Sequence, residues 1–81
     1  MSARVRLPAS LQNLLRSELE LAIHESALSR DDALIATRYL VEKTAQIDIA
    51  AELGWERATI SKRLKGITRR VAWAAARLNN T

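Results

Sequence analysis

The sequence predicts an all-α fold, in which residues 1–81 form one small domain of about four helices with a long C-terminal helix. The first half of the chain carries apolar residues at helical spacing, and two short helical patterns meet at Gly54. Beyond this glycine, apolar residues recur every four and three positions nearly to the C-terminus. A chain of 81 residues lies near the size below which one core supplies little stability by itself.

A first helix is expected over residues 8–27. Pro8 suits its first turn, because proline lacks an amide hydrogen that would have no partner there. Two apolar stripes run along this segment, one made by Leu11, Leu15, Leu19 and Ala22 and the other by Leu7, Leu14, Leu21 and Leu28. The first stripe is expected to face the core. The second is available to a partner subunit, unless both stripes enclose one core.

A supporting helix is expected over residues 29–43. Ser29 and Asp32 have the spacing of a capping box, and Asp31 adds negative charge at the positive end of the helix dipole. Capping explains the two aspartates better than acid–base catalysis, because neighbours on a helix point about 100° apart. A wide buried face follows, made by Leu34, Ile35, Ala36, Tyr39, Leu40 and Val41.

Residues 44–65 are expected to form two helices joined by a tight turn. Thr44 is the expected cap of a helix over residues 45–53, and Gly54 is expected to end that helix in the left-handed conformation that glycine adopts without steric penalty. Three groups of apolar residues face one core: Ile49, Ala50 and Leu53 before the turn, Trp55 within it, and Ile60 and Leu64 after it.

Residues 66–78 are expected to continue the last helix without a break. Ile60, Leu64, Ile67, Val71, Ala74 and Leu78 form the seam of an uninterrupted helix. An interior glycine such as Gly66 costs only about 1 kcal/mol relative to alanine. The alternative is a break at Gly66 and a new helix from Thr68, which would place Arg69 and Arg70 in a first turn, where cations are unfavourable.

The residues Gln-x-x-Ile-Ala-x-x-Leu-Gly-Trp-x-x-x-Thr-Ile-Ser-x-Arg-Leu, from Gln46 to Leu64, resemble a DNA-binding helix-turn-helix. The segment is similar to the fourth region of bacterial sigma factors and to short sigma-like and phage regulators, with a resemblance that runs from about Leu28 to Val71. Two positions depart from the pattern. Glu56 stands where these proteins often have Ser or Thr, and Gly66 interrupts a run that is usually continuous.

The resemblance implies that the second helix of the motif enters the major groove of double-stranded DNA. The residues then expected to reach base edges are Glu56, Arg57, Ala58, Ser61, Lys62 and Lys65. Those expected at phosphates are Gln46, in the first turn of the preceding helix, with Thr59, Arg63, Arg69 and Arg70. An ordinary solvated glutamine is the alternative for Gln46.

Charge is distributed unevenly along the chain. From Met1 to Leu53, six Lys and Arg residues stand against eight acids, a balance of −2. From Gly54 to Thr81, seven basic residues stand against Glu56 alone, a balance of +6. This asymmetry indicates a polyanionic partner for the C-terminal half. A solvated cationic helix face is the alternative, but here the basic residues coincide with the outward positions of the motif.

The residue types present do not favour catalysis or a cofactor. His24 is the only histidine, cysteine is absent, and two glycines leave no phosphate-binding loop. The chain also lacks an apolar run of the roughly 20 residues needed to cross a bilayer, so a cytoplasmic protein without membrane contact is expected.

These observations predict a sequence-specific transcriptional regulator that binds DNA as a homodimer. The alternatives are a sigma-like interaction module that binds RNA polymerase or a sigma partner, and a nucleoid-type protein that packs DNA without reading its bases.

Overall fold

The structure, a computed structural model, describes residues 7–79, without the side chains of residues 9 and 10. Its elements are α1 (Ala9–Gln12), α2 (Arg16–Glu25), α3 (Arg30–Ala36), the π-helical turn η1 (Thr37–Val41), α4 (Gln46–Leu53) and α5 (Arg57–Asn79). No strand occurs within these residues. The expected all-α class and the long C-terminal helix are therefore confirmed.

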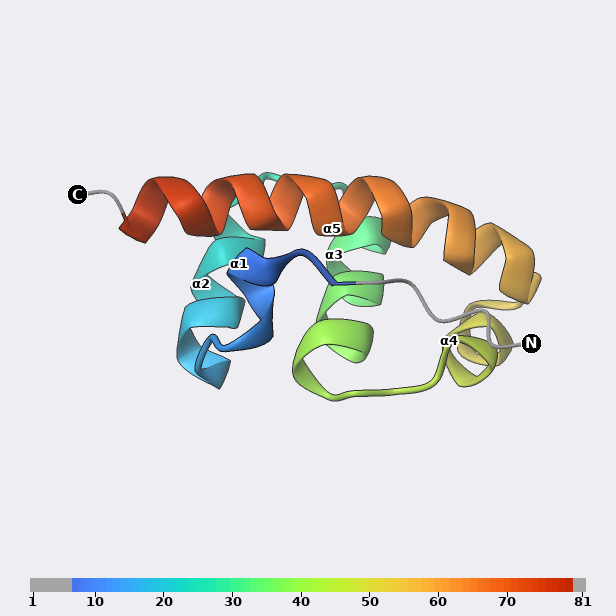
Figure 1. Cartoon of the computed structure of the whole chain (residues 1–81). Coiled ribbons are helices and arrows are strands. Elements are labelled where there is room, and N and C mark those ends of the chain that lie inside the picture. The colour runs from blue at the N-terminus through green and yellow to red at the C-terminus, as the bar shows by residue number, and fades with distance from the viewer. Residues whose placement is uncertain (1–6, 80–81) are drawn as a thin grey trace.

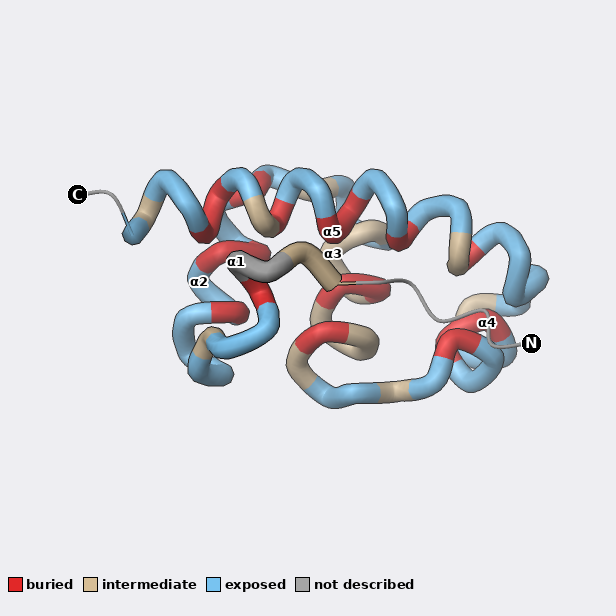
Figure 2. Tube along the Cα trace, viewed as in Figure 1, coloured by how far each residue is buried: buried red, intermediate tan, exposed pale blue. Residues whose placement is uncertain are grey.

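All the shorter helices lie on one side of α5 (Figure 1). α1 and α2 lie beneath its C-terminal half, α3 and η1 beneath its middle, and α4 beneath its N-terminal end. Buried positions of α5 face these helices and exposed positions face away (Figure 2). The largest fully buried side chains are Ile35, Leu40, Ile49, Ile60, Leu64, Ile67 and Val71.

The single helix expected over residues 8–27 is wrong, because the chain turns between α1 and α2. Leu15 has an extended backbone, with φ −68° and ψ 159°, and its amide donates a 2.8 Å hydrogen bond to Glu18 Oε1. This bond caps α2 and fixes the turn. Leu11 and Leu19 are buried, but Leu15 is 67% exposed, so the expected core stripe is interrupted.

The apolar seam of α5 and most of the second apolar stripe of residues 7–28 pack inside one chain. Ile67, Val71 and Ala74 are buried in the core. Leu7, Leu14, Leu28 and Leu78 are partly buried against that core, whereas Leu21 is 49% exposed. The alternative that both stripes of residues 7–28 enclose one core therefore describes Leu7, Leu14 and Leu28, but not Leu15 or Leu21.

The supporting helix begins as expected and ends differently. Ser29 Oγ accepts a 3.2 Å hydrogen bond from the Asp32 amide, which confirms the predicted cap. The last turn widens into η1, in which the Glu42 amide donates to the Thr37 carbonyl at 3.0 Å. The segment ends near Lys43, which has a left-handed φ of 59°.

The turn between α4 and α5 confirms the role of Gly54. This glycine has φ 72° and ψ 29°, and the Trp55 amide donates to the Ala50 carbonyl at 2.9 Å, closing the end of α4. Thr44 is not the cap of α4: Ala45 holds that position, and the Thr44 amide donates to the Arg38 carbonyl at 2.8 Å. α5 continues unbroken through Gly66, as predicted.

Candidate nucleic-acid interface

The start of α5 is fixed on its inner side and open on its outer side. Ile60 and Leu64 are fully buried, as is Ile49 of α4. The carbonyl of Glu56 accepts from the amides of Thr59 and Ile60, so helical hydrogen bonding begins directly after the turn. The first turns of α5 are thus held at a defined angle to α4 by their apolar side.

Five of the six residues expected at base edges are exposed, and Ser61 is half-buried. Ala58, Lys62 and Lys65 lie opposite the buried Ile60 and Leu64 at helical spacing. Glu56 directly precedes α5, and Arg57 is its first residue. The fold therefore brings the six expected side chains to one end of the molecule, at the start of one helix.

Four of the five residues expected at phosphates are exposed, and Gln46 is buried. Thr59 and Arg69 are exposed, and Arg69 stands two turns beyond Lys62 on the outward side of α5. Arg70 is also exposed, but its Nη2 donates to the Ser26 carbonyl at 3.4 Å. This bond directs part of the Arg70 guanidinium toward the end of α2, so Arg69 has the more outward placement.

Arg63 joins three elements. Its Nη1 donates to Asp32 Oδ1 at 2.8 Å, and its guanidinium carbon lies 4.8 Å from the centre of the Trp55 ring. Asp32 belongs to α3 and Trp55 to the turn before α5. The ion pair and the cation–π contact thus tie the start of α5 to its supports. These contacts favour an internal role for Arg63, and its expected phosphate contact stays a prediction.

Gln46 is placed in the first turn of α4, as expected, but its side chain is buried, with 8% exposure. This burial favours a role inside the protein for the Gln46 side chain. The expected contact between Gln46 and a phosphate stays a prediction.

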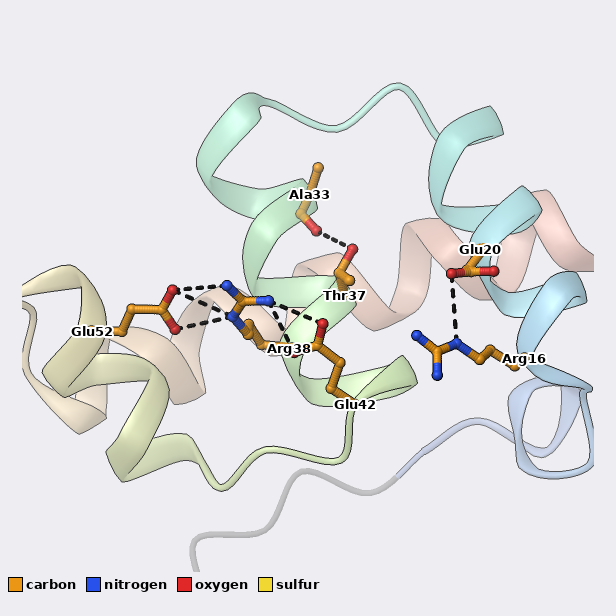
Figure 3. Close-up of polar contacts among 7 residues, drawn as sticks. All are labelled: Arg16, Glu20, Ala33, Thr37, Arg38, Glu42 and Glu52. Carbon is orange, nitrogen blue, oxygen red and sulfur yellow. Dashed lines mark hydrogen bonds and ion pairs between the residues drawn. The ribbon is translucent and has the colours of Figure 1, made fainter.

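Arg38 forms an ion-pair cluster that the sequence analysis missed (Figure 3). Its guanidinium donates to Glu42 Oε1 at 2.9 Å and to Glu52 Oε1 and Oε2 at 3.0 Å each. These hydrogen bonds lower the pKa of Glu52 and raise the pKa of Arg38 further. The spacing of Arg38 and Glu42 is a helical signal, but nothing in the sequence connects Arg38 with Glu52.

The charge of α5 has one sign. The segment from Arg57 to Asn79 carries seven basic residues and no acid. Six of these, all but Arg63, lack an ion pair with a carboxylate among the described residues. Such a surface attracts polyanions at a distance, and the attraction is screened by salt.

No protein-family model matches the chain, and the curated proteins and solved structures likewise hold no match. Within residues 7–79, no helix has both the length and the apolar character needed to cross a membrane.

Proposed function

We propose that this protein is a sequence-specific regulator of transcription that binds double-stranded DNA. In this proposal α4, the turn at Gly54 and α5 act as a helix-turn-helix, with the start of α5 in the major groove. One observation carries it: the open side of this helix is polar and cationic at the end where its buried side is locked against α4. A rigid, outward cationic helix suits the width of the major groove.

The proposed base contacts follow from the chemistry of the exposed residues. Arg57 and Lys62 can donate hydrogen bonds to guanine, and Ser61 can donate or accept. The methyl group of Ala58 can contact a thymine methyl, and the carboxylate of Glu56 can accept from the amino group of cytosine. A mixed set of this kind reads sequence, whereas a surface of lysines alone would bind all DNA similarly.

The proposed phosphate contacts are Thr59 and Arg69, with Arg70 beside them. Neutralising each phosphate releases counterions, so binding weakens as salt rises, with a log–log slope set by the number of contacts. We expect a steep slope, because seven basic residues lie on α5 against no acid.

The test begins with sites selected from a random duplex pool. Fluorescence anisotropy then compares a selected site with random DNA across a salt series. We expect Lys62→Ala to lose about 1–3 kcal/mol on the selected site and little on random DNA. Arg69→Ala is the matched control, and it should weaken both duplexes alike.

Three results would count against the proposal. Affinity that does not change with salt would remove DNA as the partner. Equal affinity for selected and random duplexes would indicate a DNA-packing protein instead. Equal losses for Lys62→Ala on both duplexes would show that Lys62 does not read bases.

A further inference from the structure

Large exposed apolar side chains gather at the end of the molecule away from α4. Trp73 is 69% exposed, Leu15 67% and Leu21 49%. Trp73 lies in the C-terminal half of α5, Leu21 lies in α2, and Leu15 directly precedes α2. These segments lie together at one end (Figure 1). Ile47 of α4, 63% exposed, is the remaining large apolar residue of this kind within the described chain. Exposed apolar side chains that form one patch are typical of interaction surfaces.

The outer side of α5 changes character along its length. Near the turn it is polar and cationic, but beyond Arg69 it presents Trp73 with the exposed Ala76 beside it. The guanidinium carbon of Arg77 lies 5.5 Å from the centre of the Trp73 ring. Tryptophan and arginine are both enriched among the residues that contribute most to protein–protein binding.

The outer side of α2 carries the opposite charge. Leu21 is followed four residues later by the exposed Glu25, just as Trp73 is followed four residues later by Arg77. α2 as a whole holds Arg16 against three glutamates, whereas residues 69–79 hold three arginines and no acid. Each face therefore pairs a large apolar side chain with a charge that complements the other face.

We propose that the occupant of these faces is a second copy of this chain. The Trp73–Arg77 face of one copy packs against the Leu21–Glu25 face of the other. Because both faces lie at the same end of the molecule, a two-fold axis forms the contact twice. Forming the contact twice is important, because a specific interface buries roughly 1,000 Å² of surface. A single pair of helix faces buries only a small part of that area.

Such a dimer leaves the start of α5 free. α5 has 23 residues and is therefore about 35 Å long, which separates Trp73 and Arg77 from the proposed groove-binding end. The contact itself does not need DNA. Its use, which is to place two copies on one duplex and so double the site that is read, rests on the proposed function.

Sedimentation equilibrium of the free protein, from micromolar to near-millimolar concentration, tests the contact. Trp73→Ser and Leu21→Ser should each weaken self-association by about ten-fold or more, as expected for central apolar contacts. Ile47→Ser is the matched control, because it removes a similarly exposed apolar side chain from the α4 end. It should leave the association constant unchanged, and circular dichroism should show all three variants folded.

A charge swap separates this arrangement from any other dimer. Arg77→Glu and Glu25→Lys should each weaken association when studied alone. An equimolar mixture should restore it, because every contact in the mixed dimer then joins opposite charges.

A wild-type protein that stays monomeric throughout would overturn the inference. So would a dimer that is insensitive to Trp73→Ser and Leu21→Ser, or a charge-swap mixture that stays dissociated. An effect of Trp73→Ser on DNA affinity alone would assign the face to DNA. Failure of the proposed function looks different, since DNA binding would be absent while self-association followed this pattern.

Discussion

At the scale of single residues, Arg63 shows how a partner in space decides a role that position on a helix leaves open. By spacing alone it lies beside the exposed face of α5 and resembles a phosphate contact. The fold instead brings Asp32, 31 residues earlier in the chain, within 2.8 Å of its guanidinium. Trp55 supplies a ring beneath it. We therefore expect Arg63 to position α5 rather than to contact a phosphate.

This role predicts a particular pattern of losses for Arg63→Ala. We expect lower discrimination between the selected site and random DNA, because α5 loses a restraint on its angle. The slope of log affinity against log salt should stay unchanged, since no phosphate contact is removed. Asp32→Asn should reproduce the effect. A salt slope smaller by about one, as expected for Arg69→Ala, would return Arg63 to the phosphate contacts.

The two glycines predict opposite stability changes. A methyl group at Gly66 would meet no atom within 4 Å, and alanine is about 1 kcal/mol more favourable in a helix. Gly66→Ala should therefore raise the free energy of unfolding by about that amount in urea titrations. Gly54→Ala also has open space, but φ is 72°, so it should lose about 1–2 kcal/mol. A lower free energy of unfolding for Gly66→Ala would contradict the open space around Gly66.

At the scale of elements, the sequence predicted those helix ends that hydrogen bonds between nearby residues determine. Ser29 caps α3 and Gly54 ends α4 through bonds to residues at most four positions away. The break before α2 escaped prediction, because leucines at helical spacing fit one continuous helix as well as two. The packing of α1 against α5 and the hydrogen bond from Leu15 to Glu18 favour two helices over one. The spacing of apolar residues carries no information about that packing.

The Arg38 cluster predicts how stability depends on pH. Its hydrogen bonds depress the pKa of Glu52 in the folded protein relative to the unfolded chain. A depressed carboxyl pKa stabilises the fold above the unfolded value, about 4.3, and this stabilisation is lost as pH falls through the folded value. The free energy of unfolding should therefore fall on acidification below about pH 5.

The matched comparison uses Glu52→Gln, which cannot titrate at this position. Its stability should be lower than that of wild type at neutral pH and should depend less on pH in the acidic window. Arg38→Gln should flatten the same window by removing the cause of the shift. Identical pH profiles for wild type and Glu52→Gln, measured by urea titration, would show that the cluster adds no stability.

At the scale of the whole molecule, the protein measures 39 × 27 × 18 Å and is arranged entirely on one side of α5. The sequence predicted the composition of the outer face, because helical spacing assigns each residue of α5 a direction. It left open whether the apolar seam of α5 would be buried within one chain or between two, and the structure buries it within one chain. That outcome depends on how α1 and α2 fold back on it, a long-range arrangement that periodicity cannot report.

In the proposed function, this one-sided arrangement separates the residues that contact DNA from the residues that keep the protein folded. Ala58, Lys62 and Lys65 contribute almost nothing to the core, so selection can change them with little penalty in stability. A library randomised at these three positions, with proline and glycine omitted, should consist mostly of folded proteins with melting temperatures close to that of wild type. Their preferred DNA sites should nevertheless diverge. In the proposed function, a chain built in this way can acquire new target sequences by drift, and its descendants can come to control different genes while keeping the same fold.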